Sequence, residues 1–334
     1  MILLTILIVS GIAFIIFALA VQPLRKKSIN GKHVVVIGGS SGIGKSVAKL
    51  AAREGAHVTI IARNVDRLEE AKQEIQQHVV DANQQIISRV SVDVADYASL
   101  DNNITQIEDQ VGPIYMMVNC AGMAICGVIE DLTLQEIKQL IDVNYLGSIY
   151  SVKSILPRLK ERKDGIVVLT GSQASLMGIY GFSIYSGCKF AVRGLAEAVH
   201  MEAKPYNVSV TLALPPDTDT PGFANENKNK PEETRIISEA GGLANPDDVA
   251  KRLLDDALVG KFFSYYGFES SVLTTLCVGM TPPLRCIEVI VQTLVLGPLR
   301  LLGCYYVTTF HKVVQNCYND KKNRELEQDT QKVQ

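Results

Sequence analysis

Short apolar runs alternate with longer segments of helical periodicity through the middle of the chain. Runs rich in β-branched residues predict strands at 33–38, 58–62, 88–92, 114–118, 166–170 and 208–214. Between them, apolar residues recur at helical spacing over 45–54, 64–78, 100–110, 134–159 and 183–204. Strands that are apolar on both faces, alternating with helices, indicate a parallel sheet covered by helices on both sides. We therefore expect an α/β, doubly wound, Rossmann-type fold over residues 30–262.

A polar segment at 215–242 follows the last of these strands and is rich in Pro, Gly, Asn and charged residues. A long loop after the carboxyl end of a strand is well placed to cover a ligand. We expect a lid there.

The amino end of the chain is strongly apolar. Residues 1–24 carry no charged side chain, and Arg25, Lys26 and Lys27 follow directly. A helix of about 20 residues spans a bilayer core of roughly 30 Å, and positive flanks stay on the cytoplasmic side. We expect a transmembrane anchor at 1–24 that leaves the rest of the chain in the cytosol. A cleaved signal peptide is the alternative, because residues 18–20 offer a small-x-small site, but its usual basic first region is absent.

A second apolar zone occupies residues 263–310. A Pro-Pro pair at 282–283 and a Gly-Pro pair at 297–298 are expected to break it into pieces shorter than a membrane span. Between these breaks the polar residues share one helical face. A helix lying in the membrane interface has this pattern, as do a re-entrant hairpin and a dimer-forming helix. We favour membrane contact for 263–310, and we expect the polar residues 311–334 to form a disordered tail.

Composition and charge narrow the class of protein. The chain has 334 residues, of which 47% are hydrophobic, and 33 basic residues nearly balance 35 acidic ones. This balance argues against nucleic acid as a partner, which would require a clustered basic surplus. The seven cysteines form no CxxC pair, and no histidine pair has ligand spacing, so we expect reduced thiols and no metal site. Length alone suggests about two domains, but one unit at 30–262 with two apolar ends accounts for the pattern.

A glycine-rich loop joins the first strand to the first helix. Its residues are Gly38, Gly39, Ser40, Ser41, Gly42, Ile43 and Gly44. Glycines permit positive φ and close approach of a ligand, and a helix N-terminus offers free N–H groups to a pyrophosphate. A tight turn alone would also use glycines. The strand before and the helix after favour a dinucleotide cofactor, with Gly38, Ser40, Ser41, Gly42 and Gly44 as candidate contacts.

The ends of the next strands favour NADPH over NADH. Sites for NAD place an acidic residue after the second strand, whereas this chain has Arg63, which can meet a 2′-phosphate with help from Arg67 and the two loop serines. A solvated surface arginine is the alternative. Asp93 and Val94 follow the third strand as candidate contacts for the adenine, although Asp93 can also simply cap the next helix. Asn119 ends the fourth strand at the ligand-binding edge of the sheet.

A tyrosine and a lysine suggest proton transfer. Tyr185 and Lys189 are four residues apart on a helix and share one face. A neighbouring ammonium is expected to lower the pKa of the phenol from about 10. Ser172, just past a strand, is placed to bind a reacting carbonyl, and Asn144 is placed to hold a water linked to the lysine. A YxxxK pattern is common by chance, so its weight comes from its position relative to the other motifs.

In this order and spacing, the glycine loop, Asn119 to Gly122, Asn144, Ser172 and the pair of Tyr185 and Lys189 resemble the short-chain dehydrogenase/reductase family over about residues 30–262. The resemblance implies a catalytic tetrad formed by Asn144, Ser172, Tyr185 and Lys189, with Tyr185 and Lys189 also binding the cofactor. It also implies a homo-oligomer, since family members commonly pair through the helices that carry Asn144 and Tyr185. Ile37 departs from the threonine that is usual there.

A narrower likeness within that family is carried by residues 38–45, 62–64 and 215–222 together with the two apolar ends. It implies NADPH-dependent reduction of the 3-keto group of a long-chain sphingoid base, at the endoplasmic reticulum membrane, with the active site facing the cytosol. The alternatives are a membrane-anchored reductase of the same family that acts on a steroid, retinoid or fatty acyl ketone, and a cofactor-binding scaffold without catalysis.

Overall fold

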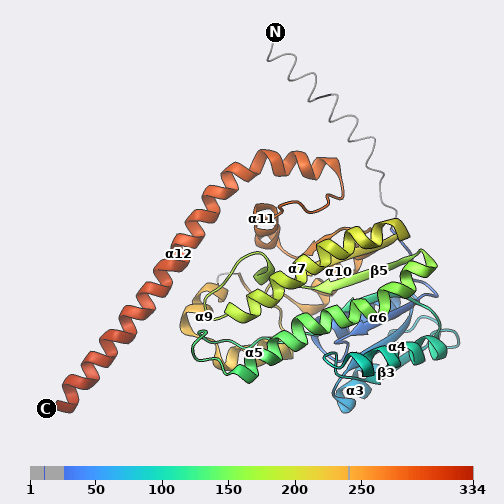
Figure 1. Cartoon of the computed structure of the whole chain (residues 1–334), viewed down its shortest axis with the longest axis horizontal. Helices are drawn as coiled ribbons and strands as arrows, with labels where there is room; N and C mark the ends of the chain where they lie inside the picture. The colour runs from blue at the N-terminus through green and yellow to red at the C-terminus, as the bar shows by residue number, and fades with distance from the viewer. Residues whose placement is uncertain (1–10, 12–25, 240, 334) are drawn as a thin grey trace, which may run out of the picture.

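A computed structural model describes residue 11 and residues 26–239 and 241–333 (Figure 1). The anchor expected at 1–24 lies outside the described residues, apart from Gly11.

A parallel sheet forms the centre of the molecule (Figure 1). Its order is β3-β2-β1-β4-β5-β6-β7. The strands are β1 (His33–Ile37), β2 (His57–Ala62), β3 (Ile87–Ser91), β4 (Ile114–Asn119), β5 (Gly165–Thr170), β6 (Val208–Leu214) and β7 (Phe263–Tyr265). The chain runs outward from β1 to β3 and then from β4 to β7, so the strand order reverses between β1 and β4. In open α/β sheets, ligands bind at such a switch point.

Helices cover both faces of this sheet. The α-helices of the described residues are α2 (Gly42–Arg53), α3 (Val65–Gln76), α4 (Tyr97–Val111), α5 (Leu134–Ile141), α6 (Gly147–Arg162), α7 (Ser183–Ala203), α8 (Pro221–Glu226), α9 (Glu232–Glu239), α10 (Pro246–Leu258), α11 (Phe268–Leu276) and α12 (Cys286–Val333). In β1, Val34 and Val36 pack toward α2, α3 and α10, whereas Val35 and Ile37 pack toward α4, α6 and α7. Both faces are buried because every residue of the strand is apolar or internally bonded, as a parallel sheet requires.

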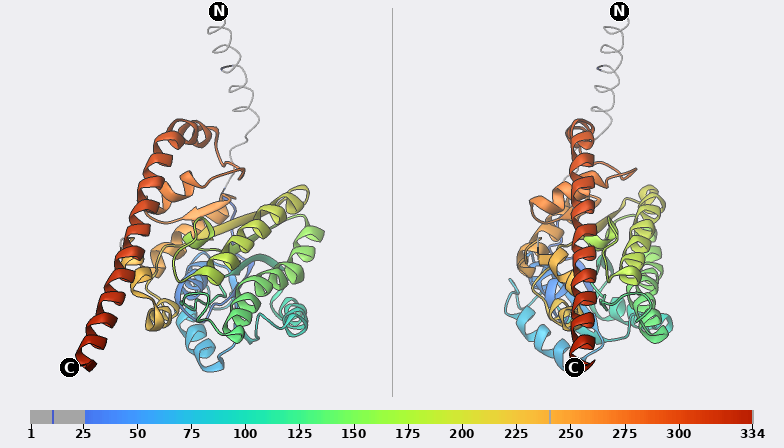
Figure 2. Two further views of the ribbon diagram at one scale, coloured as in Figure 1. Left: turned by 60° about the vertical axis from the view of Figure 1, so that its left-hand side comes forward. Right: turned by 90° about the vertical axis from the view of Figure 1, so that its left-hand side faces the viewer.

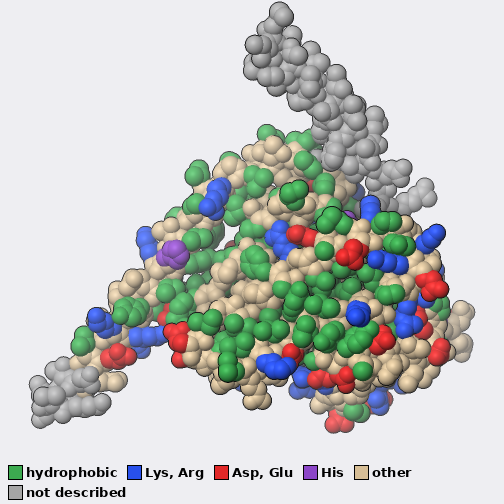
Figure 3. Space-filling view, in the orientation of Figure 1, with side chains coloured by type: hydrophobic (Ala, Val, Ile, Leu, Met, Phe, Trp, Pro, Cys, Tyr) green, Lys and Arg blue, Asp and Glu red, His purple; other side chains and the backbone are tan. Residues whose placement is uncertain are grey.

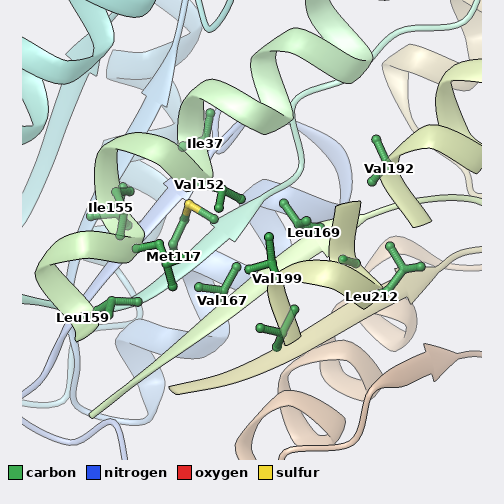
Figure 4. Close-up of a cluster of buried hydrophobic side chains, with 14 of the residues drawn as sticks. Ile37, Met117, Val152, Ile155, Leu159, Val167, Leu169, Val192, Val199 and Leu212 are labelled. Atoms are coloured by element: carbon green, nitrogen blue, oxygen red, sulfur yellow. The ribbon is translucent and has the colours of Figure 1, made fainter. Parts of the chain in front are cut away.

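Figure 4 shows the core on the second of these faces. Side chains of the strands lie against those of α6 and α7, among them Met117, Val167, Leu169, Leu212, Val152, Ile155, Leu159, Val192 and Val199. This packing holds α6 and α7 over the sheet and thereby fixes the positions of the polar residues that they carry.

The α/β fold with a parallel sheet is confirmed, and each expected strand is present within two residues of its predicted ends. β7 and α10, which complete the sheet and its cover after residue 242, were not predicted from the sequence. The segment 215–242 also contains α8 and α9, where Thr220 caps α8 by accepting a hydrogen bond from Phe223 N at 3.1 Å. The helix expected at 134–159 is interrupted by a π-helical turn at Asp142–Leu146.

Two expectations about the carboxyl end were wrong. The Gly-Pro pair at 297–298 does not break the chain into separate pieces, because α12 continues through Pro298. Figure 1 shows α12 bent between a short first part and a long second part, and one proline removes a single backbone hydrogen bond and kinks a helix without having to end it. The break at the Pro-Pro pair, residues 282–283, is present.

The polar residues from 311 onward are helical rather than disordered. They are rich in Lys, Glu, Gln and Arg, which favour helices. Lys321 also lies 2.8 Å from Glu233 of α9, a carboxylate that is almost fully buried. This ion pair joins α12 to α9, and both views of Figure 2 show α12 running beside the body of the molecule.

Within the described part of the chain, one helix is long and apolar enough to cross a membrane, by length and composition alone: Ile287–Gln328 of α12. Its apolar stretch is not buried against the rest of the described molecule. Figure 3 shows hydrophobic side chains along this helix, standing apart from the mixed surface of the body.

Candidate active site

The glycine loop lies against the turn that follows β4. Gly38 has a φ of +79°, and a Cβ at this position would come within 2.6 Å of Ala121 N. At Gly44, a Cβ would lie 2.3 Å from Gly38 O. These backbones touch, so only glycine fits, and the loop lies directly on the carboxyl end of β4.

The first turn of α2 presents groups that a ligand can use. Ser41 is its N-cap, with extended backbone, and its hydroxyl caps no N–H group of the described helix. Free N–H groups at a helix N-terminus attract phosphate. Ser40, Ser41 and Gly42 are all partly exposed, so the predicted cradle is open at the surface.

The turn after β4 links this loop to the predicted catalytic residues. Asn119 Oδ1 accepts a hydrogen bond from Ala121 N at 3.0 Å and so holds the turn from beneath, with its own side chain buried. At Gly122, a Cβ would lie 3.0 Å from Asn144 Oδ1 and 3.5 Å from Lys189 Nζ. The structure therefore brings the end of β4, Asn144 and Lys189 into contact.

Asn144 lies in the π-helical turn between α5 and α6 and is fully buried. Its amide donates to Met123 O at 2.9 Å and to Leu140 O at 3.0 Å, and its oxygen accepts from Met123 N at 3.1 Å. π-Helical turns are frequent at functional sites because the extra residue re-aims a side chain. Here the side chain fixes the loop after Gly122, and the water-holding role stays a prediction.

Tyr185 and Lys189 lie on one face of α7, with Lys189 Nζ 5.6 Å from the centre of the tyrosine ring. Lys189 is 4% exposed and donates to Thr170 O, at the end of β5, at 3.0 Å. Burial lowers the pKa of Lys189 to about 8. Ser172 lies two residues beyond Thr170 and forms a side-chain hydrogen bond with Tyr185.

The pKa of Tyr185 is raised, not lowered as the sequence analysis expected. Loss of water around the hydroxyl is the main cause, and the Glu226 carboxylate adds to it, whereas the hydrogen bond with Ser172 acts in the opposite direction. Sequence spacing indicated the neighbouring lysine but could not indicate the burial of the phenol, which sets the direction of the pKa shift. The phenol of this structure therefore holds its proton firmly.

The candidate contacts for the adenine end lie at the tips of β2 and β3. Arg63 Nη1 is 3.8 Å from Asp93 Oδ2, and Arg63 is 60% exposed. Asp93 also accepts a hydrogen bond from Ala95 N at 3.0 Å, so it shapes the turn before α4. Arg67 is exposed on the first turn of α3, whereas Val94 is buried against Gly147. These groups share the edge at which the glycine loop ends.

The segment expected to be a lid contains an ionic cluster that its sequence did not predict. Asp217, Glu226 and Lys230 gather near Phe182, whose ring centre lies 5.3 Å from that of Tyr185. The spacing of Glu226 and Lys230, four residues apart, was a signal for an ion pair on a helical turn. The polar composition of residues 215–242 indicated a loop, so this ion pair was not predicted.

Comparison with known proteins agrees with this architecture. Residues 32–231 match the family described as "short chain dehydrogenase", and the chain belongs to this family. Membership implies a nicotinamide dinucleotide cofactor, either NAD(H) or NADP(H).

Two curated relatives align over nearly the whole chain. The "3-ketodihydrosphingosine reductase" of Bos taurus is 44% identical over 320 residues, which cover 95% of this chain and 96% of the relative. The mouse protein of the same description is 43% identical, with coverage of 94% and 96%. A crystal structure of levodione reductase, 23% identical, covers 73% of this chain and 99% of its own with a TM-score of 0.66, which supports the fold.

Proposed function

We propose that this chain reduces the 3-keto group of 3-ketodihydrosphingosine to the alcohol with NADPH, giving dihydrosphingosine in sphingolipid synthesis. The observation that carries the proposal is the 44% identity to the Bos taurus reductase over 95% of the chain. The grouping of Ser172, Tyr185 and Lys189 at the switch point of the sheet supports it, since such a grouping suits carbonyl reduction.

The residues present fit a dinucleotide. Glycine at positions 38 and 44 lets the loop backbone pack closely against itself and the turn after β4, and this places the loop beside the free N-terminus of α2, which can bind a pyrophosphate. In the proposal this loop holds the pyrophosphate, Arg63 and Arg67 hold the 2′-phosphate, and Lys189 binds the nicotinamide ribose. When bound, NADPH supplies the hydride that reduces the carbonyl carbon.

The protein supplies the proton and the alignment. Tyr185 donates its proton to the carbonyl oxygen as general acid, and its raised pKa keeps that proton in place until charge develops on the oxygen. Ser172 donates a hydrogen bond to the same oxygen. Lys189, largely protonated at neutral pH, is fixed by Thr170 O and directs its remaining N–H groups toward the site.

The first test measures NADPH oxidation with 3-ketodihydrosphingosine in detergent micelles. Tyr185→Phe is expected to lower turnover by about 1,000-fold, because general acid catalysis is lost, while NADPH still binds. Tyr206→Phe, an exposed tyrosine after α7, serves as the matched control. Near wild-type turnover in Tyr185→Phe would disprove the assigned role. Faster turnover of a steroid, retinoid or fatty acyl ketone would disprove the substrate, and inactivity toward every ketone would point to a non-catalytic scaffold.

A second test addresses the choice of cofactor. Arg63→Ala is expected to lower kcat/KM for NADPH roughly tenfold with little effect on NADH, because a charge-assisted contact to the 2′-phosphate is lost. Arg53→Ala, at the far end of α2, should change neither. An equal loss with both cofactors would contradict a role in phosphate recognition.

We also propose that the chain is held at the endoplasmic reticulum membrane with its catalytic unit in the cytosol. The unburied apolar stretch of α12 supports membrane contact. The predicted anchor at 1–24, followed by three basic residues, agrees with that orientation.

Two copies of the chain are proposed to pair through α5 and α6, which flank Asn144, and through α7, which carries Tyr185. Exposed apolar side chains lie on α5 and α7, among them Leu134, Ile141, Phe190 and Met201. Figure 3 shows hydrophobic side chains gathered on this face of the body. Exposed apolar patches of this kind mark association surfaces.

A further inference from the structure

The ionic cluster of Asp217, Glu226 and Lys230, in the segment between β6 and α10, is held together by several short polar contacts. Lys230 Nζ lies 2.7 Å from Glu226 Oε1 and 4.0 Å from Asp217 Oδ2, and the lysine side chain is only 3% exposed. Lys230 also donates to Ser238 Oγ at 3.2 Å, and the Ser238 hydroxyl donates to Asp217. These bonds tie the start of the segment to α8 and α9.

This cluster lies beside the proton donor. Lys230 Nζ is 6.0 Å from the centre of the Phe182 ring, on which Tyr185 packs. Among the described charged groups, the Glu226 carboxylate has the strongest effect on the pKa of Tyr185, and it also raises the pKa of the Cys126 thiol. The cluster therefore lies close to Tyr185, next to the Phe182 ring that packs on it.

The charges of the cluster do not cancel. Two carboxylates surround one ammonium, which leaves an excess of one negative charge in a mostly buried place. Glu226 Oε1 is itself buried and is paired with the Lys230 ammonium at 2.7 Å, whereas Asp217 lies farther from that ammonium, at 4.0 Å. One ammonium can neutralise only one of the two carboxylates, so a second cation at the cluster would be favourable.

The proposed substrate carries such a cation next to its reacting carbon. A 2-amino-3-ketone has its amine on the carbon bonded to the carbonyl, so a carbonyl that contacts Tyr185 places the amine within a few ångströms of that phenol. We propose that Glu226, supported by Asp217, binds the ammonium group of the long-chain amino ketone and makes the site selective for a free amine. This inference rests on the proposed function and names the residue that would give it its specificity.

The test compares two ketones: 3-ketodihydrosphingosine and the same long-chain 1-hydroxy-3-ketone without the amine. In the wild type, kcat/KM should favour the amino ketone. Glu226→Gln should reduce this preference by about tenfold or more, mainly through KM, because a charged hydrogen bond is lost. Glu226→Asp should restore part of it. Glu232→Gln, an exposed carboxylate on α9, should leave it unchanged.

The outcomes separate the inference from the proposed function. If Glu226→Gln lowers kcat/KM equally for both ketones, or leaves the preference intact, the inference is overturned while the reductase activity stands. If the wild type reduces neither ketone, the proposed function fails and the inference fails with it. Loss of the preference with retained turnover of the amine-free ketone supports the inference, and also shows that the variant is folded.

Discussion

At the scale of single residues, burial sets the behaviour of several titratable groups, and His33 is the plainest case. Its Nδ1–H donates to Gly112 O at 2.7 Å, so Nε2 is left to accept from the Thr59 hydroxyl at 2.9 Å. The ring is 2% exposed and neutral in this arrangement. Burial lowers the pKa of His33 to about 4.

This pKa predicts a loss of stability in acid. The unfolded chain binds a proton to His33 near pH 6.5, whereas the folded chain does so only near pH 4, so stability falls as the pH drops through that window. At pH 5 we expect a loss of about 2 kcal/mol relative to pH 7.5 from this residue. Denaturant unfolding at the two pH values measures it.

The matched variants are His33→Asn and His311→Gln. The first should flatten the pH dependence, although it also lowers stability at pH 7.5 by removing buried hydrogen bonds. The second changes an exposed histidine on α12 and should leave the dependence as in the wild type. An unchanged dependence in His33→Asn would assign the acid loss to other groups.

The sequence could indicate residues whose role follows from local spacing. Tyr185 and Lys189 are adjacent because a helix brings positions four apart together, and Gly38 and Gly44 belong to a loop whose composition is informative by itself. The sequence could not indicate the raised pKa of Tyr185 or the ionic cluster around Lys230. Both depend on which segments pack together in the folded chain.

At the scale of elements, the glycine loop has the least freedom to change. A methyl group at Gly44 would press on Gly38 O, which is backbone and cannot swing away. We expect Gly44→Ala to displace the loop and weaken NADPH binding several-fold, measured by quenching of cofactor fluorescence. Gly194→Ala is the control, because a Cβ there meets nothing within 4 Å and alanine favours a helix. Unaltered binding in Gly44→Ala would show that the loop is more adaptable than its contacts indicate.

The elements that the sequence predicted well are the buried strands and the long helices, whose periodicity is strong. Those that it missed are short or polar. β7 spans only Phe263–Tyr265 and is defined by pairing with β6, and α8 depends on its Thr220 cap and on Lys230. The second half of α12 is helical where composition suggested disorder, with Lys321 paired to a buried partner far away in sequence.

At the scale of the whole molecule, N-glycosylation can test the proposed orientation of the chain in the membrane. Asn103 and Asn207 each begin an acceptor sequence for N-glycosylation, and Asn207 is exposed in a left-handed turn. A catalytic unit in the cytosol is never presented to the transferase. We expect no mass shift when the natively expressed protein is deglycosylated.

The control for this experiment is an acceptor sequence added before Met1. If the anchor at 1–24 places the amino end in the lumen, this tag should be glycosylated while Asn207 is not. A shift that disappears in Asn207→Gln would instead place the catalytic unit in the lumen and reverse the proposed orientation.

The chain is fastened to the body at its first described basic residues. Lys26 pairs with Asp255 at 2.9 Å, and Lys27 N donates to Leu258 O at 2.7 Å. Lys27 Nζ also contacts Asp164 and two backbone carbonyls where β5 and β6 begin. This attachment is at the edge of the sheet where strands start, whereas Lys321 fastens α12 to α9 beyond the edge where strands end.

The catalytic body is therefore attached to its two terminal segments at two separate places, one at each end of the strands. A single attachment would leave the sheet free to rotate in any direction about it, whereas two attachments leave only rotation about the line that joins them. The candidate site would then keep a constant angle to that line, and so would approach a surface that holds both ends of the chain over a restricted range of orientations.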